Sequence, residues 1–341
     1  MLNTVYRLVS PKQLEAVIID EELSSNTVIV RPTYLSICHA DQRYYNGSRD
    51  ASVLRKKLPM ALIHEGVGEV IKDFSGKFNQ GERVIIVPNI PSEEDPVVAE
   101  NYLPSSKFRS SGFDGLMQEY VVTTDDRLVR VLDDVPMNVA AYTEMISVAM
   151  HSILRLERLM NNDKDIIGIW GDGNLGYITA TLVKELFPKS KLYIFGKNAD
   201  KLNFFSFADE TFVVDSIPKD IRISQAFECV GGVGSQYAID QIINMIRPQG
   251  SIAIMGVSEH PIEVNTRLVL EKGLSVSGTS RSGVKDFEKT VQFLSAHPVA
   301  KRRFENLVGI EREIHNINDI HKFFEEDLAN SWGKAIMNWS I

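Results

Sequence analysis

The chain has 341 residues, 44% of them hydrophobic and 24% charged, with a formal net charge of −8 at pH 7. This length predicts two domains, and the negative charge argues against a surface built to bind nucleic acid, although it is compatible with a local basic pocket for a phosphorylated small molecule. No stretch approaches the roughly 18 apolar residues of a membrane span, the N-terminus lacks the features of a signal peptide, and two distant cysteines predict no disulfide framework, so we expect a cytoplasmic protein.

The N-terminal part of the chain, up to about residue 130, predicts a β-rich domain. β-Branched and aromatic residues bounded by turn formers favour strands over residues 27–37, 66–75, 81–88 and 117–124. The segment 89–114 between them is rich in Pro and Ser. Its composition predicts an irregular, long surface excursion.

The pattern changes near residue 139, where apolar residues follow a helical spacing over 138–159. Beyond it, strands and helices alternate, which predicts a parallel sheet with right-handed crossovers. The expected strands lie at residues 165–170, 191–196, 225–232, 251–257 and 274–280. A helix over 284–297 and a strand over 332–341 are expected to return to the first domain. We therefore expect an α/β fold with a β-rich domain at 1–148 and 283–341 and a doubly wound domain at 149–282.

A glycine pattern marks the start of the predicted parallel sheet. Gly171, Gly173 and Gly176 form G-x-G-x-x-G between an apolar strand and a helix, which is the context of a dinucleotide-binding turn. The first glycine permits the tight turn, the second lets the backbone approach a pyrophosphate, and the third lets helix and strand pack closely. We include the intervening Asn174 and Leu175 among the cofactor-binding residues. The alternative is an ordinary strand-to-helix turn.

The end of the next strand favours NADP(H) as the cofactor. An NAD site places Asp or Glu about 20 residues beyond the turn, on the ribose 2′-hydroxyl. Gly196 stands 20 positions after Gly176, and Lys197 follows it, with Lys201 nearby. These lysines suit a 2′-phosphate, unless they are only solvated surface charges.

Four residues could together hold a metal ion. Cys38 offers a thiolate, His64 an imidazole, and Glu65 and Glu144 offer carboxylates. This is a reasonable Zn²⁺ set that leaves a position open for water or substrate, and such a site would polarise a carbonyl. Taken singly, Cys38 also fits a small buried hydrophobe, and His64 with Glu65 fits a turn pair.

Six motifs appear in an order that resembles the zinc-dependent medium-chain dehydrogenase/reductase superfamily: SICHAD, IHEGVGEV, GERV, TEMISVAMH, WGDGNLG and FECVGG. The resemblance spans nearly the whole chain and implies a GroES-like catalytic domain followed by a Rossmann domain. It implies that Cys38 and His64 bind catalytic zinc and that Glu65 does so in some catalytic states. Glu144 corresponds to the glutamate that polyol-specific members use near the metal.

The same resemblance assigns further roles and shows two departures. Asp41 completes a C-x-x-D segment and would orient the metal ligands. The region that carries a four-cysteine zinc lobe in many members has no cysteine here, which predicts one zinc per chain and no structural zinc. Ala40 stands where many members have a proton-relaying Ser or Thr; His39, or a zinc-bound water held by Glu65, are the alternatives for the relay.

Within the superfamily, the chain resembles the bacterial reductases of D-ribulose 5-phosphate in wall teichoic acid synthesis. This resemblance implies NADPH-linked reduction to D-ribitol 5-phosphate, which supplies CDP-ribitol, and functional pairing with a ribitol-5-phosphate cytidylyltransferase. Members of the superfamily are usually homodimers or homotetramers. Arg43, Arg49 and Arg281 are candidates to bind the substrate phosphate, although loop arginines also simply face water.

Two other functions remain as alternatives. One is a zinc-dependent dehydrogenase of an unphosphorylated polyol such as sorbitol. The other is a zinc-free NADPH quinone reductase or binding protein, but relatives of that kind lack the metal residues that this chain has. Metal analysis separates the zinc-free class from the others.

Overall fold

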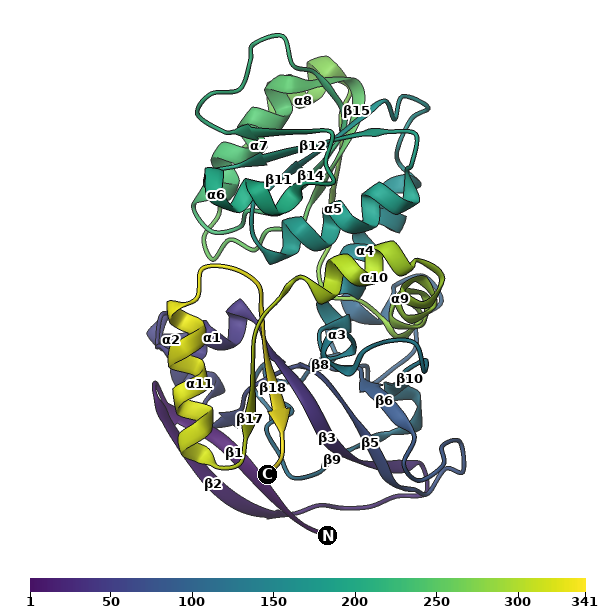
Figure 1. Cartoon of the computed structure of the whole chain (residues 1–341), viewed down its shortest axis with the longest axis vertical. Helices are drawn as coiled ribbons and strands as arrows, with labels where there is room; N and C mark the ends of the chain where they lie inside the picture. The colour runs from purple at the N-terminus through teal and green to yellow at the C-terminus, as the bar shows by residue number, and fades with distance from the viewer. The chain divides into compact units, whose positions relative to one another are not determined.

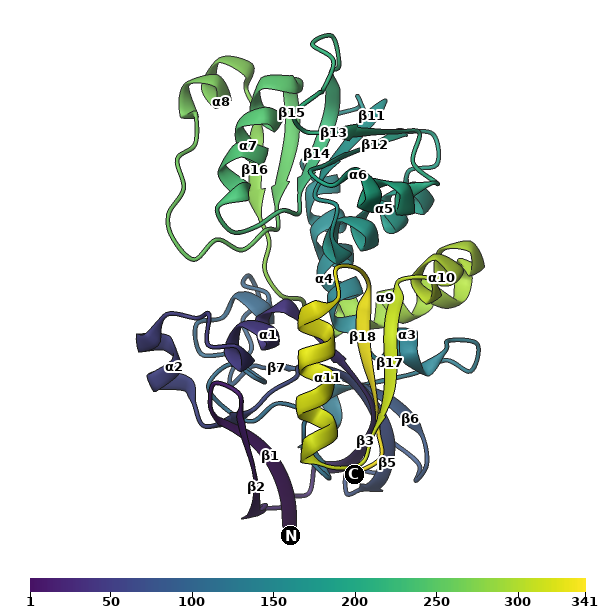
Figure 2. The same ribbon diagram turned by 60° about the vertical axis from the view of Figure 1, so that its left-hand side comes forward.

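The computed structural model describes every residue of the chain, 1–341, and the chain forms two compact units (Figures 1 and 2). Unit 1 comprises Met1–Ser147 and Arg281–Ile341, and unit 2 comprises Val148–Ser280. Unit 1 thus ends one residue before the expected position 148 and resumes two residues before the expected 283. None of the helices combines the length and apolar character that crossing a bilayer requires.

Unit 1 is built mainly from antiparallel strands. Its strands are β1 (Leu2–Ser10), β2 (Gln13–Asp20), β3 (Thr27–Ile37), β4 (Met60–Ala61), β5 (Glu65–Asp73), β6 (Arg83–Ile86), β7 (Asn89–Ile90), β8 (Lys107–Phe108), β9 (Val121–Thr124), β10 (Leu128–Arg130), β17 (Val308–Ile314) and β18 (Lys334–Trp339). Its helices are α1 (His39–Tyr45), α2 (Ala51–Lys57), η1 (Glu100–Tyr102), η2 (Asp125–Arg127), α3 (Met137–Ala140), α9 (Val284–Ala296), α10 (Pro298–Glu305) and α11 (Ile317–Ala329). Helix α4 (Thr143–Glu157) contains the boundary with unit 2. The helical spacing over 138–159 is therefore divided between α3 and α4.

Strand β3 lies in the middle of the main sheet of unit 1, whose order is β10-β6-β5-β3-β18-β17. Its apolar residues are buried along most of its length. Pro32 has no N–H to offer a neighbouring strand, and it stands where the register with β5 shifts. Strand β18 pairs antiparallel with β3, so the C-terminal strand joins the same sheet as β3, while β1 and β2 lie in a separate sheet with β4.

The segment 89–114 is more ordered than its composition predicts. Strands β7 and β8 pair within it, with Asn89 opposite Phe108, and Arg109 and Ser110 are each only 5% exposed. The expectation of an irregular surface excursion is therefore wrong for the part around β8. The cause is tertiary: polar residues here pack under neighbouring elements instead of facing water.

Unit 2 contains the doubly wound parallel sheet that the sequence predicts. Its elements are β11 (Ile166–Trp170), α5 (Asn174–Leu186), β12 (Lys191–Gly196), α6 (Ala199–Leu202), η3 (Asn203–Phe205), β13 (Glu210–Val213), β14 (Ile223–Glu228), α7 (Gly234–Met245), β15 (Ile246–Ile254), α8 (Thr266–Lys272) and β16 (Ser275–Gly278).

The strand order in unit 2 is β13-β12-β11-β14-β15-β16, and all of its pairings are parallel. The chain winds outward from β11 in one direction and then from β14 in the other. Right-handed crossovers therefore place α5 and α6 on one face and α7 and α8 on the opposite face (Figure 2). In such sheets the ligand binds beyond the carboxyl ends of the strands at which the order reverses, here β11 and β14.

Candidate active site

Two strand ends bring the predicted metal ligands together. Cys38 follows the last residue of β3, and His64 immediately precedes β5. The antiparallel register places Ser36 opposite Glu65, so the C-terminal end of one strand meets the start of the other. The ligand atoms of Cys38, His64 and Glu65 all lie within 4.8 Å of one another.

A lysine completes this cluster, and sequence reasoning missed it. The pairing of Ile37 with Ala335 places Lys334, the first residue of β18, at the same sheet end. Its ammonium lies 2.8 Å from the Glu65 carboxylate and donates to the Ile37 carbonyl at 2.9 Å. Burial lowers the pKa of Lys334, but the negative charges of Glu65, Cys38 and Asp327 together outweigh this and raise it overall, so the ammonium stays charged. Only the strand pairing reveals this contact.

Asp41 organises the backbone around the cluster, as expected for the C-x-x-D segment. Its carboxylate accepts hydrogen bonds from the Cys38 amide at 3.1 Å, the Ile63 amide at 3.0 Å and the Ser110 hydroxyl at 2.8 Å. His64 Nδ1 lies 3.7 Å from it. Burial raises the pKa of Asp41, but the charge of His64 and these hydrogen bonds lower it overall. The carboxylate therefore stays ionised and fixes the orientation of the residues that bear the ligands.

Three non-glycine residues next to these groups adopt left-handed backbone conformations. They are Ile63 (φ 71°), Ser110 (φ 59°) and Arg281 (φ 60°). Such a conformation costs on the order of 1–3 kcal/mol and persists only where the surrounding structure enforces it. Ile63 and Ser110 each hold a hydrogen bond to Asp41. Three of the five non-glycine residues with positive φ thus lie at or beside the site, the other two being Lys12 and Gln249.

Glu144 and His39 lie outside the group of ligand atoms formed by Cys38, His64 and Glu65. Glu144, in the first turn of α4, is buried, and burial raises its pKa to about 7. His39 is exposed, and its Nδ1 lies 2.9 Å from the Gln42 side-chain oxygen. A metal-binding role for Glu144 and a proton-relay role for His39 stay predictions.

The donor set fits zinc. Both oxygens of Glu65 are buried and accept no hydrogen bond, because the Lys334 ammonium lies at ion-pair distance without hydrogen-bond geometry. Burial raises the pKa of the Cys38 thiol, and the adjacent His64 partly offsets this effect. A thiolate, an imidazole and a carboxylate are the ligands that Zn²⁺ takes at catalytic sites, where one position stays open. A divalent cation would also satisfy the two Glu65 oxygens.

The predicted phosphate-binding arginines make different contacts. The Arg281 guanidinium stacks on Phe108, with Cζ 4.5 Å from the ring centroid, and the Phe108 and His64 rings lie 5.3 Å apart. Arg49 lies over the ring of Tyr44 at 4.8 Å. Arg43 lies on α1 and is partly buried.

In unit 2 the glycine turn has the geometry that its spacing predicts. Gly171 adopts φ 130°, and a Cβ on Gly176 would lie 1.9 Å from the Gly171 carbonyl oxygen. A Cβ on Gly173 would meet no atom within 4 Å, so space for a ligand remains there. Helix α5 begins at Asn174, which directs unbonded amides towards that space.

An acid that sequence reasoning missed contacts the residues at the end of β12. Lys197 is exposed and Lys201 half-buried. Asp172, from the glycine turn, accepts a hydrogen bond from the Asn198 amide at 2.7 Å, and a Cβ on Gly196 would lie 2.7 Å from the Asp172 Cβ. The carboxylate is thus engaged with backbone, and it holds the segment that bears Lys197.

A cysteine–histidine–carboxylate cluster in a β-rich unit, joined to a doubly wound unit with a dinucleotide turn, defines a zinc-dependent dehydrogenase. Comparison with known families agrees. Residues 24–133 match the alcohol dehydrogenase GroES-like domain, and residues 206–296 match the zinc-binding dehydrogenase model. The chain belongs to the zinc-binding dehydrogenases of the medium-chain dehydrogenase/reductase superfamily, which confirms the resemblance and the fold class.

Several relatives match over their whole length. The chain is 54% identical to ribulose-5-phosphate reductase 1 of Staphylococcus aureus, with 99% of each chain covered. It is 51% identical to ribulose-5-phosphate reductase of Bacillus spizizenii, with 100% of each covered. Among solved structures, that of S. aureus TarJ in complex with NADPH superposes with a TM-score of 0.89 at 48% identity and full coverage of both chains.

Proposed function

We propose that this chain is a zinc-dependent enzyme that reduces D-ribulose 5-phosphate to D-ribitol 5-phosphate with NADPH. The observation that carries the proposal is 54% identity along the full length to a ribulose-5-phosphate reductase, together with a formed Cys38, His64 and Glu65 cluster. The NADPH-bound neighbour and the lysines after β12 support NADPH as the reductant.

The residues of unit 1 would hold and polarise the substrate. When bound, zinc supplies Lewis-acid stabilisation of the charge that develops on the carbonyl oxygen, and NADPH supplies the hydride. Cys38, His64 and Glu65 would hold the metal, while Asp41 fixes the Cys38 and Ile63 amides. Lys334 balances the charge of the Glu65 carboxylate.

Each hydride transfer also requires one proton, and the candidate donors are His39 and a water held by Glu65. Ala40 offers no hydroxyl, so His39, or a water held by Glu65, would deliver the proton to the product oxygen. Glu144 is a further candidate for the proton donor, because burial raises the pKa of this acid to about 7.

The biological setting is also proposed. D-Ribitol 5-phosphate would pass to a ribitol-5-phosphate cytidylyltransferase, which makes CDP-ribitol for wall teichoic acid. We propose a homodimer or homotetramer as the working form. A thiolate ligand and an NADPH-dependent reaction both suit the reducing cytoplasm.

NADPH oxidation with three sugars tests the proposal: D-ribulose 5-phosphate, D-ribulose and D-xylulose 5-phosphate, each with and without a zinc chelator. We expect D-ribulose 5-phosphate to give the highest kcat/KM and the chelator to abolish turnover. Equal or faster reaction with D-ribulose would favour the dehydrogenase of an unphosphorylated polyol. Full activity in protein stripped of zinc would favour the zinc-free class.

A further inference from the structure

Two cationic side chains from separate segments of unit 1 contact the segment 89–114 beside the metal cluster. Lys57 ends α2 and donates to the Ser111 hydroxyl, and Arg281 precedes α9 and stacks on Phe108. Burial lowers the pKa of Lys57, and the charges that lower it further are all positive: those of Arg49, Arg281 and Lys56. Holding like charges together at partly buried positions is electrostatically unfavourable. Burial lowers the pKa of Arg281, and the charge of Glu144 partly offsets this, whereas every charge that acts on Lys57 is positive.

Phe108 connects these cations to the metal cluster. Its ring lies 5.3 Å from the His64 ring, centroid to centroid, and it carries the Arg281 guanidinium with Cζ at 4.5 Å. Arg281 therefore stands one aromatic ring away from a predicted zinc ligand. A pentulose 5-phosphate has its carbonyl near one end and its phosphate at the other, and so needs a cationic site at a short remove from the metal.

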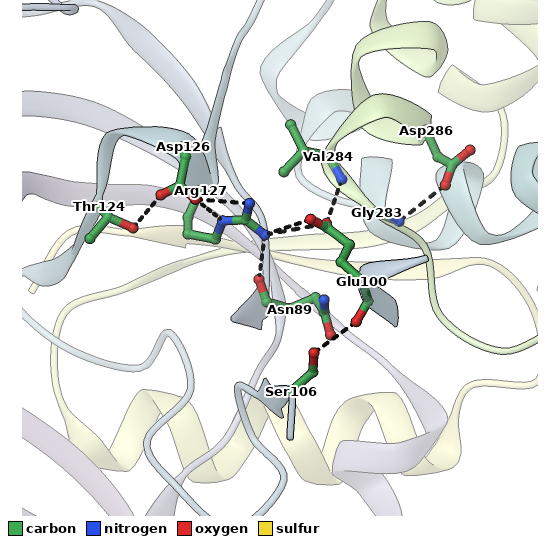
Figure 3. Close-up of polar contacts among 9 residues, drawn as sticks. All are labelled: Asn89, Glu100, Ser106, Thr124, Asp126, Arg127, Gly283, Val284 and Asp286. Carbon is green, nitrogen blue, oxygen red and sulfur yellow. Dashed lines mark hydrogen bonds and ion pairs between the residues drawn. The ribbon is translucent and has the colours of Figure 1, made fainter. Parts of the chain in front are cut away.

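The segment 89–114 supplies the groups that position Arg281 and Lys57. Phe108 lies in β8, and the Ser111 hydroxyl accepts a hydrogen bond from the Lys57 ammonium at 2.6 Å. Glu100, from the same segment, accepts a hydrogen bond from the Val284 amide at 2.8 Å (Figure 3). This contact fixes the first turn of α9, three residues after Arg281.

Glu100 is itself held from the other side (Figure 3). Arg127 donates to its two carboxylate oxygens at 3.2 and 3.3 Å and to the Asn89 carbonyl at 3.1 Å. The Arg127 side chain is only 7% exposed, which makes the pair stronger than a surface ion pair. The left-handed conformation of Arg281 (φ 60°) is thus maintained by a fixed helix start on one side and the Phe108 ring beneath its guanidinium.

We propose that Arg281 and Lys57 form the binding site for the phosphate group of the substrate, with Phe108 as the wall between that site and the metal cluster. The inference rests on the proposed function and deepens it, because it assigns the phosphate to particular side chains. It adds Lys57, which sequence reasoning did not consider, and it rests on the two cations that contact the segment 89–114. Arg281 supplies a planar fork that can bind two phosphate oxygens at once, and Lys57 supplies a point charge.

Steady-state kinetics of Lys57→Met, with Lys56→Met as the matched control, tests the site. Lys56 is the exposed neighbour of Lys57 on the same helix, so both changes remove one positive charge and keep an aliphatic stem. We expect Lys57→Met to raise KM for D-ribulose 5-phosphate about tenfold to a hundredfold, the value of one charge-assisted hydrogen bond. The kcat should change little, and inorganic phosphate should become a correspondingly weaker competitive inhibitor.

Arg281→Lys is the second variant, because it keeps the charge and removes the fork. We expect a smaller rise in KM and, again, weaker inhibition by phosphate. The inference is overturned if Lys57→Met behaves like Lys56→Met, or if phosphate inhibits the variants as strongly as the parent. Failure of the proposed function has a different signature: the parent enzyme would then show no preference for D-ribulose 5-phosphate over D-ribulose.

Discussion

Lys334 and Glu65 form an ion pair with side chains that are 1% and 0% exposed. Removing two opposite charges from water costs several kcal/mol for each ion, and their attraction does little more than offset it. A hydrophobic pair would therefore serve stability equally well. The pair instead places a carboxylate at the strand ends, where a cation can bind it.

Lys334→Met should lower the free energy of unfolding of the metal-free protein by about 3–5 kcal/mol, because it leaves the Glu65 charge buried without its partner. The double variant Lys334→Met/Glu65→Gln should recover most of this loss. Urea unfolding followed by fluorescence measures both, with Lys322→Met, at an exposed position on α11, as the control. A double variant as unstable as Lys334→Met alone would show that the lysine acts through packing and not through the ion pair.

At the level of residues, short sequence motifs predicted the site residues that lie within those motifs. Cys38, His64 and Glu65 were predicted from short segments, and the structure brings their ligand atoms together. Lys334 and Asp172 were missed, because each acts through a contact between distant segments: Lys334 through the pairing of β18 with β3, and Asp172 through the Asn198 amide. No spacing rule within the sequence encodes such a contact.

The ends of strands position both the metal cluster and the expected cofactor site. In unit 1, β3 ends and β5 and β18 begin at the metal cluster. In unit 2, the carboxyl end of β14 bears Glu228, which is 0% exposed. Its carboxylate accepts hydrogen bonds from the amides of Val230, Gly231 and Gly256 at 2.9, 3.0 and 3.0 Å. One side chain thus connects the loops after β14 and β15, where the sheet is expected to bind its cofactor.

Glu228→Gln should therefore loosen two loops at once. Replacing one carboxylate oxygen by an NH₂ group leaves at least one backbone N–H without its acceptor, because it now faces another donor. Such a loss costs about 1–3 kcal/mol for a buried group. We expect a lower free energy of unfolding and weaker NADPH binding, measured by urea titration and by NADPH fluorescence. Glu210→Gln, at an exposed position on β13, is the control. NADPH affinity and stability equal to those of this control would contradict the role assigned to Glu228.

The elements themselves were predictable to different degrees. Five of the six strands of unit 2 overlap a predicted strand: β11, β12, β14, β15 and β16. Strand β13, a short and partly exposed edge strand, was not predicted. Over residues 89–114 there is no long apolar run, and the pairing of β7 with β8 and the burial of Arg109 and Ser110 depend on neighbouring elements. The groups that shape the proposed phosphate site therefore come from the least predictable part of the chain.

At the scale of the whole molecule, the two binding tasks belong to separate units. All three clustered ligands lie in unit 1, and the glycine turn and both candidate lysines lie in unit 2. No cysteine occurs in the segment 89–114, and the other cysteine, Cys229, is buried in unit 2, where its sulfur lies 3.6 Å from the Thr179 hydroxyl. The donor set of the chain thus supports a single zinc ion, and zinc and NADPH binding should be separable by mutation.

Cys38→Ser and Lys197→Asp should have complementary effects. Cys38→Ser replaces the only thiolate in the cluster, so the zinc content of the purified protein should fall from about one per chain to a small fraction, while NADPH affinity stays within about twofold of the parent value.

Lys197→Asp places a carboxylate where a 2′-phosphate is expected, so NADPH affinity should fall at least about tenfold and preference should move towards NADH, with zinc content unchanged. Elemental analysis and NADPH fluorescence titration measure the two quantities, with Lys219→Asp, exposed elsewhere in unit 2, as the charge-matched control. Two zinc ions per chain, or retention of zinc by Cys38→Ser, would contradict the single-site assignment, and an unchanged cofactor preference in Lys197→Asp would remove Lys197 from the cofactor site.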